Sequence, residues 1–291
     1  MIQRLFNRYE EVTYDALNRL CKDSGAKVFA KVRVADVLKL EGSGVSAEHF
    51  GYGLRSHFDF VVVDSDYQPL FSVEFDGPLH KTSEVQMKRD RLKNELCDHC
   101  HHGLLRIKSN YLSETYRGLD LLTYFVDAWF LEQAFDEAQR SGLIPYDESF
   151  DMTSIYSDGS QSGRKWPYWL SFDIQNSLRK LHSAGAIGQM APSYHVGKDG
   201  NGAYRCLSWL VFDASHVVSV STGMHAQRFP AVCKSELVSM LAMVDLNSRV
   251  ENVLRGDRAH LLDRRHFFES RLPAFQEKYP MVCASIMSAT L

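Results

Sequence analysis

Two strand-like segments separated by a short turn constrain the N-terminal half of this chain most strongly. The sequences SHFDFVVVD, SDYQ and PLFSVEFDG follow one another over residues 56–77. Both flanking segments are rich in Phe and Val, which favours β-strands. If the chain folds back about Asp66 and Tyr67, Asp59 lies opposite Glu74, because residues equally distant from the turn pair with each other. The sequence therefore predicts a β-hairpin that brings two carboxylates together.

Side chains alternate between the two faces along each strand of this hairpin. One face should carry the apolar side chains of Phe58, Phe60, Val62, Phe71, Val73 and Phe75. The other face should carry His57, Asp59, Glu74 and Asp76 at one end of the hairpin. Like charges directly opposite one another destabilise a sheet, so a cation should offset this acidic cluster. A divalent cation with oxygen ligands is suited to that role.

The composition limits the class of protein. The chain has 291 residues, 45% of them hydrophobic and 24% charged, which fits one or two globular domains. No apolar stretch approaches the ~20 residues of a membrane helix, and the charged N-terminus lacks a signal-peptide run. Six cysteines in a chain of this length favour reduced thiols and a cytoplasmic location. A net charge of −3 provides no global positive field, so nucleic-acid binding would need a local basic patch.

The periodicity of apolar residues predicts the remaining elements. We expect helices at 3–22, 83–101 and 113–140, strands at 26–34 and 103–108, and a mobile Gly- and Ser-rich loop at 41–56. The polar residues 143–165 indicate a linker between a domain at 1–142 and an α+β domain at 166–291. In the second domain we expect helices at 170–184 and 230–255, strands at 192–197, 203–212 and 216–222, and one or two terminal helices.

An ordered set of motifs includes and follows the hairpin. The set comprises Asp59-Phe60, Val73-Glu74-Phe75-Asp76-Gly77, His80, Arg89-Asp90, Lys93, Gly103 and Leu105-Arg106-Ile107. It resembles the PD-(D/E)XK nuclease superfamily, and within it the group related to very short patch repair endonucleases and to uncharacterised restriction-endonuclease-like domains. The resemblance covers roughly residues 7–110. It implies an α/β fold with a restriction-endonuclease-like core, in which helices flank a mixed sheet, beside a second α+β domain.

The resemblance also implies a metal site. Asp59 and Glu74 would hold Mg²⁺ or Mn²⁺, and the Phe75 carbonyl could be a further ligand. Glu10 on the first helix matches a family acid that can complete the metal shell, with Glu11 as the neighbouring alternative. Phosphodiester hydrolysis needs an activated water and neutralisation of developing negative charge, both of which a carboxylate-bound divalent ion provides.

The chain departs from the family pattern at one position. The superfamily usually has a lysine two residues after the second acid, and Asp76 stands there instead. Lys93 on the following helix is the expected substitute, with Lys88 as an alternative. We expect Asp76 and His80 to assist catalysis. His80 could act as a general base, orient a carboxylate or contact phosphate, or it could simply be a turn residue.

Basic residues near the acidic cluster are candidates for nucleic-acid contact. Arg89 and Lys93 lie four residues apart, so they share a helix face. We expect Lys88, Arg89 and Arg106 to bind the nucleic acid. The alternatives are a solvated charged helix and an Arg106 that pairs with an acid.

The leading interpretation is a divalent-metal-dependent endonuclease that hydrolyses DNA, with a role in defence or repair suggested by the resemblance alone. RNA remains an alternative substrate. A second interpretation is a catalytically inactive nuclease-fold module that binds nucleic acid, which the missing lysine favours. The chain could also work as a homodimer or as a subunit of a larger complex. The sequence assigns no role to the second domain.

Three weaker patterns compete with this interpretation. Cys97, His99, Cys100, His101 and His102 resemble zinc ligands, although a second C-x-x-C pair is missing and packing of the thiols is the alternative. The basic and aromatic residues 164–172 could stack on unpaired bases or anchor a core. A helix and hairpin with Arg179, Lys180 and Lys198 faintly resemble a winged-helix reader of DNA.

Overall fold

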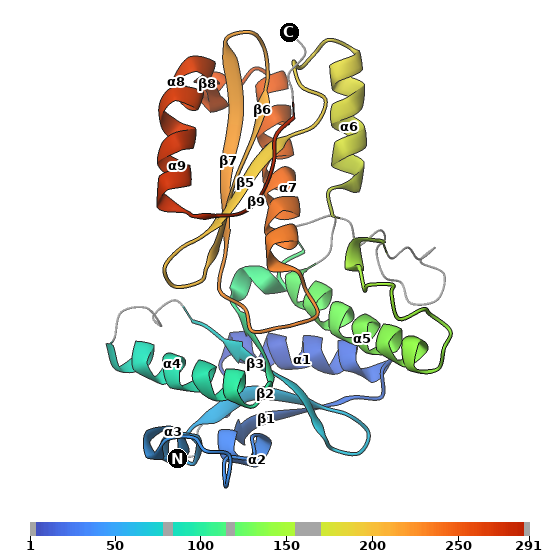
Figure 1. Cartoon of the computed structure of the whole chain (residues 1–291), viewed down its shortest axis with the longest axis vertical. Coiled ribbons are helices and arrows are strands. Elements are labelled where there is room, and N and C mark those ends of the chain that lie inside the picture. The colour runs from blue at the N-terminus through green and yellow to red at the C-terminus, as the bar shows by residue number, and fades with distance from the viewer. Residues whose placement is uncertain (1–3, 78–83, 115–119, 155–169, 288–291) are drawn as a thin grey trace. The chain divides into compact units, whose positions relative to one another are not determined.

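A computed structural model describes residues 4–77, 84–114, 120–154 and 170–287. The chain forms two compact units (Figure 1). The first unit consists of residues 1–150 and 227–232, and the second consists of residues 151–226 and 233–291. Both units contain a sheet flanked by helices, which confirms the mixed α/β class expected from the sequence.

The sheet of the first unit contains four described strands in the order β1-β2-β3-β4. Their bounds are Lys27–Arg33, His57–Val63, Pro69–Phe75 and Gly103–Ile107. The pairs β1-β2 and β2-β3 are antiparallel, whereas β3 and β4 are parallel. Helix α4, Glu84–His99, connects the two parallel strands, as a parallel pair requires a crossover of this kind.

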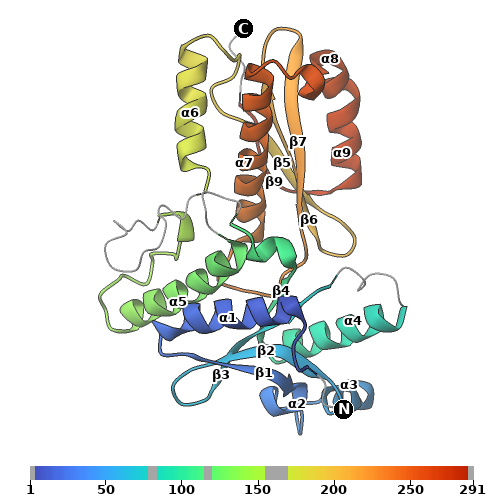
Figure 2. The same cartoon turned by 180° about the vertical axis from the view of Figure 1, so that it is seen from behind.

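Helices cover both faces of this sheet, which explains why β2 to β4 are almost entirely buried. Figures 1 and 2, seen from opposite sides, show α1 (Arg8–Lys22) on one face and α4 on the other. On the α1 side, Phe60 contacts Phe6 and Tyr14, and Phe71 contacts Trp129 of α5, Leu121–Arg140. On the α4 side, Val61, Val63 and Leu104 pack with Leu96 and Cys97.

The hairpin has the register that its sequence symmetry predicts. Phe60 pairs with Val73 and Val62 pairs with Phe71, and a bulge follows next to the turn. The β2-β3 ladder ends at Phe60, before Asp59 and Glu74. At this open end, side-chain carboxylates instead accept the hydrogen bonds of backbone amides, as described below.

Two expectations for this unit are wrong. Phe58 does not share a face with Phe60, because it packs in the cluster on the α4 side, beyond the end of the ladder. Residues 41–56 are also not a simple loop, since they contain helix α3, Ala47–Gly53. The Ser46 hydroxyl accepts a hydrogen bond from the His49 amide and thereby caps this helix. A short helix α2, Val34–Val37, follows β1 directly.

A segment from the distant part of the chain completes the first unit. The Leu104 amide donates to the Arg228 carbonyl at 2.8 Å, which adds residues 227–232 beside β4. The Phe229 ring is fully buried among the rings of Phe71, Phe125 and Trp129. The sequence pattern gives no indication of this return, because it joins residues more than a hundred positions apart.

The second unit is built on a five-stranded antiparallel sheet in the order β8-β7-β6-β5-β9. The bounds of β5, β6 and β7 are Ser193–Lys198, Tyr204–Val211 and His216–Met224, close to the predicted strands. The edge strands β8, Leu261–Asp263, and β9, Met281–Ser285, were not predicted. Their short length hides the period-2 pattern on which such a prediction depends.

Helices pack on both faces of this second sheet. Helices α6 (Phe172–Ser183) and α7 (Lys234–Leu254) enclose one core with Leu178, Leu210 and Leu246. On the other face, Trp209 packs against Phe267 in a segment that comprises α8, a π-helical stretch and α9. These three elements span Arg264–His266, Phe267–Arg271 and Leu272–Lys278.

The part of the chain that the structure describes contains no helix with the length and apolarity needed to cross a bilayer. Residues 155–165 of the predicted linker 143–165, and most of the aromatic stretch 164–172, lie outside the described residues. Short 3-10 helices are present at Ser109–Leu112, Met152–Ser154 and Arg258–His260.

Candidate acidic site at the open end of the hairpin

Asp59 and Glu74 lie side by side where the β2-β3 ladder opens. The Glu74 Oε1 atom accepts a hydrogen bond from the Asp59 amide at 3.2 Å. In return, the Asp59 Oδ2 atom accepts one from the Phe75 amide at 3.0 Å. Each carboxylate is therefore fastened to the backbone of the opposite strand, which fixes both acids in one place and replaces the missing ladder bonds.

Lys93 reaches this site from the middle of α4. Its ammonium group lies 2.7 Å from Glu74 Oε1 and donates to the His57 carbonyl at 2.8 Å. The Lys93 and Glu74 side chains are only 8% and 11% exposed, so the pair is almost completely removed from water. The structure thus brings Lys93, rather than a residue two positions after Glu74, next to the second acid.

A second lysine, Lys31 of β1, lies on the Asp59 side. Its ammonium group is 2.7 Å from Asp59 Oδ1 and 2.6 Å from Glu10 Oε1 of α1. Glu10 is itself held in place, because its Oε2 atom accepts from the Asn7 amide while Asn7 Oδ1 accepts from the Glu10 amide. This capping box at the start of α1 orients Glu10 toward the sheet. Glu11 instead pairs with Arg4 and points elsewhere.

The electrostatics differ between the two acid–lysine contacts. Burial raises the pKa of the Glu74 carboxyl, and this effect outweighs the opposing influence of Lys93. Burial lowers the pKa of Lys31, but its hydrogen bonds with Asp59 and Glu10 outweigh burial, so the Lys31 pKa is raised overall. The site therefore holds a buried carboxylate that is costly to ionise and an ammonium group that the surrounding acids stabilise.

Asp76, two residues after Glu74, is paired with Arg106 of β4. The Arg106 Nη1 atom donates to Asp76 Oδ1 at 2.9 Å, and its Nε atom donates to Asn94 Oδ1 at 3.2 Å. The Nη2 atom lies 3.4 Å from Asp90 Oδ1 without making a hydrogen bond. The Arg106 side chain is only 9% exposed, so its guanidinium group interacts with these neighbouring side chains and little of it is accessible to solvent.

The other predicted contacts lie further from the acids or outside the described residues. Lys88 forms an ion pair with Glu48 of α3 at 2.6 Å. Arg89 is exposed on α4. His80 falls in the stretch 78–83, outside the residues that the structure describes. The structure therefore brings together Glu10, Asp59, Glu74 and Lys93, whereas it places Lys88 in a separate ion pair.

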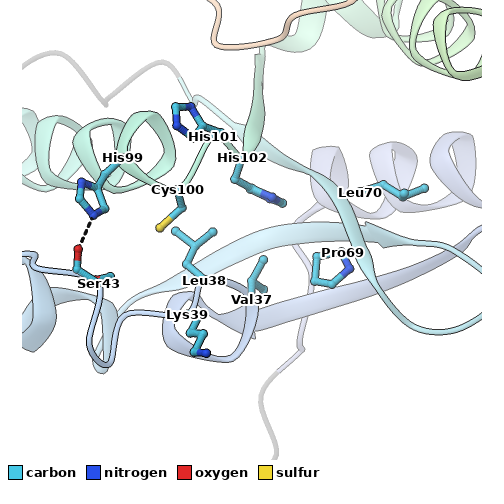
Figure 3. Close-up of a pocket in the computed structure, with 10 residues that line it drawn as sticks. All are labelled: Val37, Leu38, Lys39, Ser43, Pro69, Leu70, His99, Cys100, His101 and His102. Atoms are coloured by element: carbon cyan, nitrogen blue, oxygen red, sulfur yellow. Dashed lines mark hydrogen bonds between the residues drawn. The ribbon is translucent and has the colours of Figure 1, made fainter. Parts of the chain in front are cut away.

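The cysteine and histidine residues at the end of α4 do not converge. His99, Cys100, His101 and His102 line a pocket of about 470 Å³. Figure 3 shows Cys100 directed toward Leu38 and His101 directed away from Leu38. His99 bonds the Ser43 carbonyl at 2.9 Å, and His102 bonds the Ser72 hydroxyl at 2.8 Å. Among the described residues, no group of three or more His, Cys, Asp or Glu side chains is arranged as a metal site.

The thiols of this stretch instead pack in the core. Cys97 is buried and Cys100 packs against the same apolar cluster. Burial raises the pKa of the Cys97 thiol to about 12, so the thiol remains protonated at neutral pH. The packing alternative therefore accounts for both residues.

Lys31 and Gln227 are among the residues near the site that the sequence pattern does not identify, as is Asn94, which accepts a hydrogen bond from Arg106. A signal for Lys31 exists, because a lysine in an otherwise apolar strand can pair with an acid on the neighbouring strand. Finding it requires the β1-β2 register, which places Lys31 beside Asp59 between the pairs Ala30–Phe60 and Val32–Phe58. Gln227 bonds both backbone groups of Arg106 at 2.9 and 2.7 Å, and nothing in the sequence signals this contact.

Comparisons with known proteins leave the activity open. A family described as a protein of unknown function, DUF2726, matches residues 2–119. This match spans less than half of the chain and contains each of the site residues considered above except Gln227. No curated protein matches the chain, and no solved structure matches it.

Proposed function

We propose that the first unit has a restriction-endonuclease-like core and is a divalent-metal-dependent nuclease that hydrolyses phosphodiester bonds of DNA. The observation that carries this proposal is the pair Asp59 and Glu74, fixed side by side with the Lys93 ammonium 2.7 Å from Glu74. Two carboxylates can hold a divalent ion for phosphodiester hydrolysis, and a lysine beside them can stabilise negative charge that develops on the phosphoryl group.

Glu10, Asp59 and Glu74 do not form a three-ligand metal group as they stand, but the carboxylate oxygens that face Lys31 suit Mg²⁺ or Mn²⁺. Glu10 and Asp59 both direct a carboxylate oxygen at the single cationic atom Lys31 Nζ, at 2.6 and 2.7 Å. Oxygen atoms that already converge on one positive charge are suited to a hard divalent cation. Mg²⁺ commonly takes only one or two protein carboxylates and completes its shell with water and phosphate oxygens. Asp59 and Glu74 would hold the ion, and Glu10 would complete the set.

In the proposed hydrolysis, the divalent ion and the residues of the chain have different roles. A bound divalent ion lowers the pKa of water and neutralises charge on the phosphoryl oxygens. Lys93, held by the His57 carbonyl and Glu74, would offer its remaining N–H to the attacking water or to a phosphate oxygen. The hydrogen bonds from the Asp59 and Phe75 amides keep both carboxylates in their orientation during this step.

A second function, binding of nucleic acid without cleavage, is favoured by one observation. Asp76 stands where the superfamily usually has lysine, and it is tied to Arg106 at 2.9 Å. If Lys93 does not replace that lysine, the unit would bind nucleic acid, alone or within a larger complex, without hydrolysing it. Such binding would weaken strongly with added salt and would need no divalent ion.

Purified full-length protein should be incubated with supercoiled plasmid, single-stranded DNA and RNA in Mg²⁺ or Mn²⁺. We expect nicking or degradation of DNA that Asp59→Asn and Glu74→Gln reduce more than about 100-fold, because even outer partners of a metal site contribute 10–100-fold. These isosteric changes are preferable to alanine, since glutamine at position 74 keeps a hydrogen-bond acceptor for the buried Lys93 ammonium.

Glu10 and Glu11 provide a matched pair of variants. Glu10→Gln should reduce cleavage by about tenfold or more, because only Glu10 faces Asp59 across Lys31. Glu11→Gln should leave cleavage unchanged, since Glu11 pairs with Arg4. Cleavage that survives in both Asp59→Asn and Glu74→Gln would refute the assignment. Salt-sensitive binding without product would select the second function.

A further inference from the structure

Lys31 differs from its neighbours in β1 in its backbone conformation. Its φ is +54°, in the left-handed region that a side chain with a Cβ atom disfavours. Ala30 and Val32 on either side pair regularly with Phe60 and Phe58. Strained residues of this kind persist where the surrounding structure requires them, and they concentrate at functional sites. Here the unusual conformation accompanies an ammonium group that bridges Glu10 and Asp59.

The two lysines of the site differ in their freedom to move. The Lys93 side chain is 8% exposed and is held by Glu74 and the His57 carbonyl. The Lys31 side chain is 41% exposed, and both of its hydrogen-bond partners are carboxylates of the site. Lys31 can therefore move its charge into water with a small change in solvation, whereas Lys93 cannot.

We propose that Lys31 is an exchangeable internal counter-cation, which occupies the position between Glu10 and Asp59 until a divalent ion displaces it. This inference rests on the proposed function, because it assumes that the divalent ion binds these carboxylates. The ammonium and the ion require the same oxygen atoms, and two cations at this separation repel each other. Lys31 thus competes with the ion and sets the concentration of metal at which the site fills.

If Lys31 competes with the ion, removal of the Lys31 charge should strengthen metal binding. Without the Lys31 charge, Glu10 and Asp59 repel each other, and the binding of a divalent ion relieves that repulsion. Lys31→Met removes the charge and keeps the length of the side chain. Lys31→Gly removes the charge and also suits the positive φ. Both variants should bind Mn²⁺ on the order of tenfold more tightly than the natural protein, since partly exposed ion pairs are individually weak.

The test is a calorimetric titration of the full chain with Mn²⁺, with folding of each variant checked by circular dichroism. Lys27→Met is the matched control, because Lys27 lies on the same strand and its ammonium sits over the Tyr67 ring, 3.7 Å from the centroid. It causes the same change in net charge and should leave Mn²⁺ affinity unchanged. Asp59→Asn should abolish or strongly weaken binding in every background.

The outcomes separate this inference from the proposed function. Tighter binding by both Lys31 variants, with Lys27→Met unchanged, supports the inference. Equal or weaker binding by the Lys31 variants, with binding still dependent on Asp59, overturns the role of Lys31 and leaves the proposed metal site intact. Binding that is indifferent to Asp59, or absent from every variant, overturns both.

Discussion

Removal of one member of the buried Glu74–Lys93 pair should destabilise the first unit severely. The two side chains are 11% and 8% exposed and their charged atoms are 2.7 Å apart. Glu74→Ala would leave the Lys93 ammonium buried with only the His57 carbonyl as a described hydrogen-bond partner. Breaking a buried ion pair in this way costs about 3–5 kcal/mol. For a unit of this size we expect a fall in melting temperature of about 10 °C.

The size of this effect depends on what replaces the carboxylate. Glu74→Gln keeps an oxygen that can accept from Lys93 and from the Asp59 amide but no longer neutralises the ammonium, so it should cost about 2–3 kcal/mol, less than Glu74→Ala. The double variant Glu74→Met with Lys93→Met removes both charges together. It should be close to neutral, because the desolvation of two ions is avoided when their attraction is lost.

Hydrogen exchange followed by mass spectrometry can measure this loss of stability in the first unit. Peptides from β2 and β3 report the free energy of opening of the first unit, and peptides from β6 and β7 serve as an internal reference. The coupling energy between Glu74 and Lys93 follows from the two single Met variants and the double variant. A coupling energy below about 1 kcal/mol would show that the pair contributes little, and the electrostatic reasoning would be refuted.

Two further predictions test other parts of the structure. His102 is partly buried beside the Phe58 ring, and this burial lowers its pKa from 6.5 to about 4, so the unfolded chain binds a proton between these values that the folded chain does not. The free energy of unfolding should therefore fall by about 2 kcal/mol as the pH falls from 7 to 5. Urea unfolding of His102→Gln should show a pH dependence that lacks this contribution. The same pH dependence in the variant and in the natural protein would contradict the assignment. Phe229→Ala should cost about 3–5 kcal/mol because the ring is fully buried. Hydrogen exchange should show this loss of stability in β3, β4 and α5. The control Phe268→Ala, at a position 38% exposed, should have little effect on these elements. A loss of stability confined to β6 and β7 would be inconsistent with the assignment of residues 227–232 to the first unit.

The parts of the fold that sequence predicts are those set by local pattern. The hairpin register follows from symmetry about the turn, and the pairing of Phe60 with Val73 agrees with it. Lys93 beside the second acid is instead what the family resemblance implies, with Lys88 as the alternative, because helical spacing alone does not choose between them. The hairpin register depends on residues close together in the chain, where side-chain periodicity and turn position leave few alternatives.

The parts that sequence does not predict depend on contacts between distant segments. Gln227 bonds the backbone of Arg106, and Phe229 enters the core beside Phe71, from a segment that leaves and re-enters the second unit. Helix α3 forms within a Gly- and Ser-rich stretch because Ser46 caps it and Gly53 packs closely beneath Leu40. In each case packing outweighs the local preference of the sequence.

The acidic site depends both on local sequence pattern and on contacts between distant segments. Local pattern places Asp59 opposite Glu74, but the pattern does not reveal that the β2-β3 ladder ends one pair earlier, at Phe60 and Val73. This ending frees the Asp59 and Phe75 amides to bind carboxylates. It also coincides with the turn of Phe58 toward α4, where its ring lies 5.4 Å from the Lys93 ammonium. The opening of the ladder therefore accounts for the fixed carboxylates, and it lies at the same end of the hairpin as the Phe58 ring and the contact between Lys93 and the second acid.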